Sequence, residues 1–182
     1  MVKFILGVVA DISSGKDTVA RYLAEKYGFE RHTLSDVLRA EARVRKVKPT
    51  RENLYKIVDE IRAKDGKEAL VKRVIKKFKR DKIVISGIRE KEEIEYLREK
   101  FPGKVKILHL TSDAKLRFER IKGRGRTGDP KTFKEFLEQE KREQKKFNFN
   151  IIFSMADLKI ENKGTIEELY KQIDCLLKTQ NI

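Results

Sequence analysis

The stretch Ala10–Thr18, ADISSGKDT, contains the residue types that bind phosphate groups. A glycine lets backbone N–H groups turn toward an anion, and a helix that begins there adds the positive end of its dipole. The Lys16 ammonium would reach the outer phosphates of a nucleotide, and a hydroxyl just after it would lie beside magnesium. The general pattern G-x-x-x-x-G-K-[ST] is met at Gly15 and Lys16. Ala10 replaces its first glycine, and Thr18 comes one place late.

The flanking residues predict the elements that must position this loop. Residues 3–9, KFILGVV, form a short apolar run that is typical of a strand. Over residues 15–28 apolar side chains recur at helical spacing, and Gly28 stands where a helix is expected to end. A strand, a loop and a helix in this order form the setting of a phosphate-binding loop. The alternative is an ordinary strand-to-helix turn with an exposed lysine.

The rest of the chain repeats the alternation of strands and helices. Ser35 is predicted as the N-cap of the helix after the second strand, and Pro49 ends that helix. Further strands are predicted over residues 30–34, 82–86, 105–111 and 158–162, and further helices over 36–47, 51–66, 67–81, 89–101, 113–123, 131–147 and 166–178. This alternation predicts a parallel sheet with helices on both faces. Residues 1–182 contain no internal repeat or linker and are predicted to form one domain.

In this setting SGKDT resembles the loop of nucleoside monophosphate kinases, which ends Gly-Lys-x-Thr. The resemblance extends along nearly the whole chain through the blocks SGKDTVARYL, LSDVLR, TRENL, IVDEIRAKDG, ISGIRE, RFERIKGRGRTGDPKTFKEFLEQEKRE and ADLKIENKGTIEELYKQI. The sequence is most similar to archaeal and bacterial kinase-like proteins related to dephospho-CoA kinase and adenylate kinase. The resemblance implies a three-layer α/β/α P-loop kinase fold with a parallel five-stranded sheet. It also implies acceptor-binding helices over about 35–80 and a lid over about 120–145.

The resemblance further implies ATP and Mg²⁺ as cofactors. Thr18 would be the magnesium ligand, with Asp17 as a weaker second candidate. The residues expected to bind the nucleotide are Ser13, Ser14, Gly15, Lys16, Asp17, Thr18, Arg120 and Asn162, the last because ADLKIEN resembles the loop beside the adenine.

An acceptor site is expected around Asp36, Arg39 and Arg89. LSDVLR follows the second strand, where Asp36 could orient an attacking oxygen and Arg39 could hold an acceptor phosphate. Alternatively, Asp36 only faces a helix dipole and Arg39 only lies on the surface. Arg89 in SGIRE inherits the phosphate-gripping role of the Gly-x-Pro-Arg block of adenylate kinases. Its position at the carboxyl end of a strand independently favours ligand binding.

The segment RFERIKGRGRTGDP resembles a lid that closes arginines over the phosphates. Its candidates are Arg120, Arg124 and Arg126, of which the last two are also expected to be catalytic with Lys16. The alternative is a flexible basic loop. One of Arg117 and Arg120 is expected only to cover the helix face that they share.

Two positions depart from the family pattern. Ala10 stands at the first glycine position, and Ser86 stands where the family commonly has a carboxylate that helps to hold magnesium through water. Asp11 or Asp17 could compensate because both lie in the loop.

The composition, with 39% hydrophobic and 40% charged residues, is that of a folded and highly charged protein. The net charge of +15 suits a nucleic-acid surface or a heat-adapted protein, and the mixing of basic residues with Glu favours the second. One cysteine, Cys175, excludes an intrachain disulfide and indicates a cytoplasmic protein. No apolar run approaches the roughly 20 residues that span a membrane. His32 and His109 lack metal-ligand spacing and are expected to pack in strands.

We therefore expect an enzyme that transfers the γ-phosphoryl group of ATP to a small-molecule acceptor, a nucleoside or deoxynucleoside monophosphate. Arg89 suits this acceptor, whereas Asp36 suits a dephospho-CoA kinase, whose acceptor is a ribose hydroxyl, so both remain open. Two alternatives come from other classes of protein. One is a nucleotide-binding protein with little catalysis, which Ala10 and Ser86 would favour, and the other is an RNA-associated protein, which the positive charge would favour. The sequence determines neither the acceptor, the donor base nor the oligomeric state.

Overall fold

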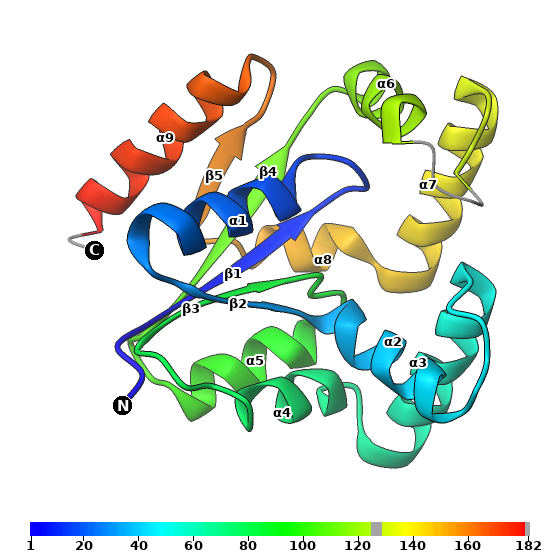
Figure 1. The fold of residues 1–182 in the computed structure, drawn as a ribbon, viewed down its shortest axis with the longest axis horizontal. Coiled ribbons are helices and arrows are strands. Elements are labelled where there is room, and N and C mark those ends of the chain that lie inside the picture. The colour runs from blue at the N-terminus through cyan, green and yellow to red at the C-terminus, as the bar shows by residue number, and fades with distance from the viewer. Residues whose placement is uncertain (125–128, 181–182) are drawn as a thin grey trace.

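The computed structural model describes residues 1–124 and 129–180, and its centre is a parallel sheet of five strands in the order β2-β3-β1-β4-β5 (Figure 1). The strands are β1 (Phe4–Ala10), β2 (Glu30–Thr33), β3 (Lys82–Ser86), β4 (Val105–Thr111) and β5 (Leu158–Glu161). Every neighbouring pair is parallel, so the predicted sheet is confirmed. Parallel strands point their carboxyl ends to one edge of the sheet. The predicted phosphate-binding loop, residues 11–15, follows β1 at that edge and is called the phosphate-type loop below.

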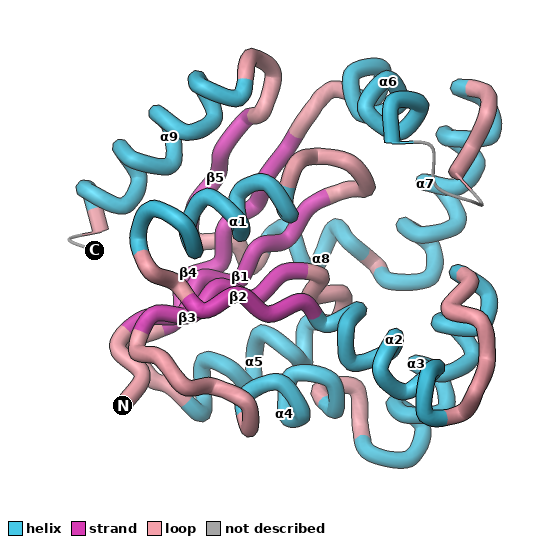
Figure 2. Tube along the Cα trace, in the orientation of Figure 1, coloured by secondary structure: helices cyan, strands magenta, loops and turns pink. Residues whose placement is uncertain are grey.

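Helices cover both faces of the sheet, as Figure 2 shows. They are α1 (Lys16–Tyr27), α2 (Leu34–Val44), α3 (Arg51–Asp65), α4 (Ala69–Ile75), α5 (Lys91–Lys100), α6 (Ala114–Arg124), α7 (Phe133–Phe147), α8 (Phe149–Ser154) and α9 (Ile166–Thr179). Helices α1 and α9 lie on one face, and α4 and α5 lie on the other (Figure 1). The three-layer arrangement expected from the sequence is confirmed.

The alternation of side chains along β1 divides the core between the two faces. Leu6 and Val8 pack with the buried residues of α1 and α9, whereas Ile5 and Val9 pack with those of α2 to α5 and α8. Successive side chains of a strand point to opposite faces, so a strand buried on both faces must be apolar throughout. This requirement explains the unbroken apolar run that identified β1.

Helices α2, α3, α6 and α7 gather at the carboxyl end of the strands (Figure 1). A third, smaller core joins α6 to α7 through Phe118, Ile121 and Phe136, and Ile12 of the loop after β1 packs against it. The predicted lid region therefore contacts the phosphate-type loop directly. Arg126, which was expected to be an arginine of the lid, lies outside the described residues.

Three local predictions differ from the structure. Helix α2 begins at Leu34 with Thr33 at its N-cap, so the prediction that Ser35 caps it is wrong. Helix α4 is shorter than predicted, covering Ala69–Ile75. Helix α8 was not predicted, because six residues give too little periodicity; its burial of Phe149 and Ile152 stabilises it instead.

Among residues 1–124 and 129–180, no helix is long and apolar enough to cross a membrane.

Candidate active site

The loop between β1 and α1 has a backbone that only a few residue types adopt easily. Ser13 has a φ of 59° and Gly15 a φ of 101°, both in the left-handed region. These turns let α1 begin at Lys16, and the N–H groups of its first turn have no partner within the helix. Unpaired N–H groups at the positive end of a helix dipole form an anion site.

Asn162, which follows β5, holds the backbone of this loop at Ser14. Its side-chain amide donates to the Ser14 carbonyl at 2.8 Å, and its Oδ1 accepts from Arg120 at 3.2 Å. Asn162 is 4% exposed, and a Cβ added at Gly15 would lie 2.7 Å from its Nδ2. Both ends of the amide are thus used inside the protein. A contact with the adenine stays a prediction, and the observed geometry is that of a positioning residue.

The side chains around the loop supply a cationic donor set. Lys16 is only 26% exposed, and burial lowers the pKa of its ammonium. Asp17, at 3.8 Å, opposes this effect on the pKa, while the charges of Arg89 and Arg124 add to it. The Ser14 hydroxyl is buried and has no hydrogen-bond partner among the described residues. The chemistry of this set fits a polyphosphate group.

Magnesium donors are sparse near the loop. The half-buried Thr18 supplies a hydroxyl, and Asp17 an exposed carboxylate. Ser86 is fully buried and shares a hydrogen bond of 3.0 Å with the Thr33 hydroxyl. Within the described part of the chain, no group of three acidic, His or Cys residues could hold a metal ion. One hydroxyl and one carboxylate fit a Mg²⁺ ion that a nucleotide brings with its phosphates, since such ions keep several water ligands.

A cavity of about 960 Å³ opens beside the loop, at the carboxyl ends of β1 and β3. Lys16, Asp36, Arg39, Arg89 and Arg124 all line it, so the structure brings together these sequence-predicted residues. The apolar part of its wall includes Leu34, Leu38, Leu54, Ile88, Phe147 and Phe149. A cavity with cations at one end and an apolar wall can hold a molecule that has an anionic group and a flat or apolar body.

Asp36 and Arg39 form an exposed pair at the cavity. Arg39 donates to Asp36 Oδ1 at 2.7 Å and to the Ser35 hydroxyl at 3.0 Å. Their side chains are 70% and 45% exposed. Both groups are therefore free to reorient toward an acceptor, and an exposed pair contributes little to stability.

Arg89 belongs to a cluster that sequence reasoning missed. Its Nη1 donates to Glu143 Oε2 at 3.4 Å, and its guanidinium lies 4.7 Å from the centre of the Phe147 ring. Glu143 Oε1 accepts from Arg51 at 2.9 Å and from Tyr55 at 3.1 Å.

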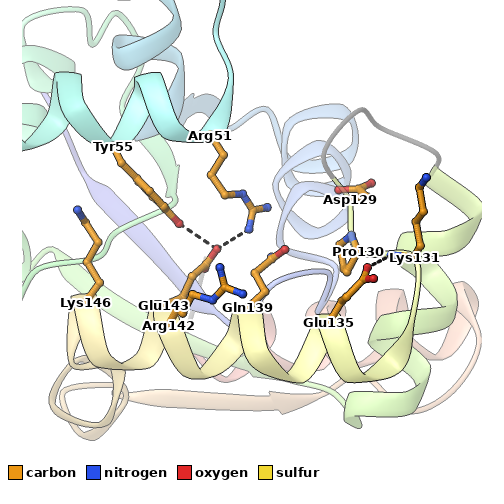
Figure 3. Close-up of a pocket in the computed structure, with 10 residues that line it drawn as sticks. All are labelled: Arg51, Tyr55, Asp129, Pro130, Lys131, Glu135, Gln139, Arg142, Glu143 and Lys146. Carbon is orange, nitrogen blue, oxygen red and sulfur yellow. Dashed lines mark hydrogen bonds and ion pairs between the residues drawn. The ribbon is translucent and has the colours of Figure 1, made fainter.

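Figure 3 shows Arg51 and Tyr55 reaching from α3 toward Glu143 on α7, across a second cavity of about 610 Å³. Burial raises the pKa of Tyr55, and the Glu143 charge adds to this, so the phenol stays a donor. Glu143 lies in the charged run EQEKREQKKF, where nothing in the pattern separates it from solvent-facing carboxylates.

Arg120 and Arg124 of the predicted lid, and the neighbouring Arg117, have distinct partners. Arg124 pairs with Asp129, its Nε lying 3.0 Å from Oδ2. Arg117 is 6% exposed and donates to Glu140 and to the Ser112 carbonyl, and it is the one that holds α6 in place. Arg120 donates to Ser112 and Asn162, and burial lowers the pKa of its guanidinium.

Comparisons with known proteins agree with this arrangement. A family model described as an AAA domain matches residues 6–147. A UPF0200 protein of Pyrobaculum aerophilum is 38% identical over 175 residues, covering 95% of this chain and 96% of that protein. A UPF0200 protein of Thermococcus gammatolerans is 34% identical over 173 residues, covering 91% of this chain and 89% of that protein.

Two solved structures share the fold at low sequence identity. Shikimate kinase from Acinetobacter baumannii, in complex with shikimate, has a TM-score of 0.62 at 16% identity, covering 100% of this chain and 96% of that chain. A gluconokinase from Sinorhizobium meliloti has a TM-score of 0.54 at 16% identity, covering 93% and 88%. The P-loop kinase-like fold expected from the sequence is thereby confirmed. These matches do not single out adenylate kinase or dephospho-CoA kinase.

Proposed function

The chain belongs to the AAA domain family and to the UPF0200 proteins, and from this premise we propose that it is an ATP-dependent phosphotransferase acting on a nucleotide acceptor. The single observation that carries the proposal is the cavity of about 960 Å³ that Lys16 and Arg89 both line. Two cationic groups in one cavity suit a reaction that joins two anionic molecules, because phosphoryl transfer depends on positioning and charge neutralisation.

On the donor side, the first-turn N–H groups of α1 and the Lys16 ammonium hold the β- and γ-phosphates of ATP. Thr18 is the hydroxyl ligand of Mg²⁺, with Asp17 as the second candidate, and the bound metal supplies neutralisation of phosphate charge. Arg124 adds a cation when it leaves Asp129 for the phosphates. Asn162 and Arg120 keep the loop in shape for this task.

On the acceptor side, Arg89 holds the acceptor phosphate. Arg39 guides the acceptor into the cavity, and Asp36 orients the acceptor once Arg39 has turned away. A phosphate acceptor is already ionised at neutral pH, so Asp36 takes a proton only where the attacking group is a hydroxyl. The apolar wall around Leu38 and Leu54 takes the base. The preferred acceptor is a nucleoside or deoxynucleoside monophosphate, with dephospho-CoA as the alternative that Asp36 would serve.

The experiment that tests this proposal is a screen of ATP and GTP consumption against nucleoside monophosphates, deoxynucleotides and dephospho-CoA. We expect one acceptor class to give turnover that requires Mg²⁺. Binding of nucleotides without product across the whole panel would instead favour a nucleotide-binding protein with little catalysis. The buried Ser86, whose hydroxyl is shared with Thr33, supports that second candidate because β3 presents no carboxylate there.

Replacement of Lys16 tests the donor side. Lys16→Ala should lower kcat at least about 100-fold, because it removes a charged contact that is strongest in the transition state. Steady-state rates and a thermal melt of the same preparation separate lost chemistry from lost folding. A variant that turns over like the wild type would exclude the proposed mechanism.

A further inference from the structure

A buried carboxylate, Glu143 of α7, lies between two arginines in the proposed acceptor cavity. Arg51 comes from the first turn of α3, and Arg89 comes from the loop that follows β3. With Tyr55 they give Glu143 three donors from two other parts of the chain (Figure 3). A carboxylate has about four lone-pair sites, so it can hold several donors in fixed directions.

The exposed fractions show that the carboxylate is more buried than the two arginines that it contacts. The Glu143 side chain is only 9% exposed, whereas those of Arg51 and Arg89 are 38% and 35% exposed. Each guanidinium gives one terminal nitrogen to Glu143 and retains further N–H donors. Glu143 is therefore the most buried member of the group, and both arginines line the cavity with N–H donors that Glu143 does not use.

The aromatic rings next to Arg89 restrict it further. Its guanidinium lies 4.7 Å from the centre of the Phe147 ring and 5.9 Å from that of Phe149. Contact with a ring face and an ion pair together limit the orientation of a planar group. Arg89 is thus held by α7 and α8 as well as by its own loop.

We propose that Arg51 and Arg89 form a two-arginine clamp for the anionic group of the acceptor, a phosphate ester, and that Glu143 is the positioning residue of this clamp. Two oriented guanidiniums match the several oxygens of a phosphate. The three charges sum to +1, so the cluster still attracts an anion. This inference rests on the proposed function and adds Arg51, Glu143 and a phosphorylated acceptor class to it.

The clamp also links the acceptor site to the lid region. Glu143 belongs to α7, and Lys146 one turn later pairs with Asp59 of α3 at 2.7 Å. Because Glu143 is the group that aligns both arginines, the clamp is complete only while α7 is packed against α3.

The test is a titration of the full chain with inorganic phosphate at constant ionic strength, followed by calorimetry. Lys16→Ala removes the Lys16 contribution to phosphate binding at the phosphate-type loop. A phosphate site that remains in this variant, and is lost when Arg51→Ala is added, is the clamp. In the Lys16→Ala background, Glu143→Gln should weaken phosphate binding about five- to tenfold. A glutamine carbonyl orients one guanidinium at most, and its NH₂ group faces the other.

The sign of this effect separates positioning from simple charge. Removing a negative charge next to two arginines raises the local positive potential, and this alone would tighten phosphate binding. Tighter or unchanged binding by Glu143→Gln therefore overturns the proposal. Glu138→Gln is the matched control, since Glu138 is on the same helix, is 49% exposed and lies 3.7 Å from Arg142; it should leave phosphate binding unchanged.

Tyr55→Phe provides a second variant if Glu143→Gln fails to fold. It removes one donor to Glu143 and leaves all three charges, so it should weaken phosphate binding about two- to threefold. Unchanged phosphate binding in this variant would argue against positioning through Glu143.

The outcomes also separate the clamp from the proposed function. Phosphate binding that depends on Arg51 and Glu143, in a chain that phosphorylates no acceptor, would retain the clamp and reject the enzyme. Turnover of a nucleotide whose KM is unchanged in Arg51→Ala would retain the enzyme and reject the clamp.

Discussion

At the scale of single residues, the phosphate-type loop depends on a side chain that lies almost 150 positions away. Asn162 donates to the Ser14 carbonyl across 148 positions of sequence, and it lies where any side chain on Gly15 would point. The glycine is thus required for two reasons, its φ of 101° and the contact with Asn162. Ala10, at the position of the missing glycine, packs against the core that the sheet shares with α1 and α9.

The two requirements at Gly15 can be measured separately. Gly15→Ala should destabilise the protein by about 2–4 kcal/mol, combining left-handed strain with a clash against Asn162. Gly28→Ala should cost only about 1 kcal/mol, because Gly28 has a φ of 71° but open space around its Cβ position. Urea unfolding of both variants gives the comparison. Equal losses of unfolding free energy would mean that the contact with Asn162 adds no cost to the left-handed strain that both variants share.

At the scale of elements, a polar cluster joins the C-terminal half of α1 to the middle of α9. Asp174 of α9 accepts hydrogen bonds from Tyr22, Lys26 and Tyr27 of α1 at 2.6, 2.8 and 2.7 Å. The Tyr22 ring stacks on Tyr170 with centroids 3.8 Å apart. Since β5 and Asn162 precede α9, this contact holds the last strand and helix against α1, which begins at the phosphate-type loop.

The Asp174 cluster predicts a loss of stability in acid. Burial acts to raise the pKa of Asp174, but hydrogen bonds from Lys26, Tyr22 and Tyr27 outweigh it and hold the pKa at about 2, against 3.8 in an unfolded chain. Because the folded-state pKa is depressed, the contribution is present above about pH 4 and is lost as pH falls toward 2. Asp174→Asn should lower the unfolding free energy at pH 7 on the order of 1 kcal/mol, after allowance for solvent screening.

Denaturant unfolding of wild type and Asp174→Asn at several pH values checks this expectation. The difference in unfolding free energy should shrink between pH 4 and pH 2. A difference that stays constant over this range would show that the tyrosine hydrogen bonds act without the charge. Asp59→Asn is a control. Asp59 is also in an ion pair, with Lys146, but its side chain is 58% exposed, so the substitution should change the unfolding free energy far less.

At the scale of the whole molecule, the net charge of +15 is spread over helices rather than gathered in one arm. Many of the cations are paired, as in the cluster of Arg62 with Glu90 and Glu93 and the chain of Arg45 with Glu41 and Glu60. Networks of this kind suit a heat-adapted protein, because the desolvation penalty of charges falls with temperature. The excess of positive over negative side chains attracts anions in general, and this includes a phosphorylated substrate.

This distribution of charge predicts only non-specific binding of RNA. We expect the affinity for a short single-stranded RNA to fall steeply between 50 and 200 mM salt, roughly as a power of the salt concentration set by the number of phosphates contacted. Fluorescence anisotropy of a labelled oligonucleotide measures it. Binding that stays tight at 200 mM salt and prefers one sequence would favour an RNA-associated function over a small-molecule kinase.

Patterns local in sequence were sufficient for most of the fold. Apolar runs identified β1, β3 and β4, and helical spacing identified the long helices, because burial on one or both faces dictates those patterns directly. The exceptions are short elements. Helix α8 and the start of α2 at Leu34 are decided by packing against the sheet rather than by propensity. Of the candidate site, the sequence supplied Lys16, Arg89 and the other members that follow strands, since strand ends meet at one edge.

The sequence by itself determined that a strand, a glycine-lysine loop and a helix would stand at the carboxyl edge of a parallel sheet. Only the tertiary structure decided which distant side chains complete the site. Asn162 was expected beside the adenine, and the structure shows instead its contact with Ser14. Glu143 is an ordinary polar residue in its own segment, and its burial against Arg51 gives it its role. A hydrogen bond across 92 or 148 positions leaves no periodicity in the chain, so it becomes visible only when the sheet and α7 are in place.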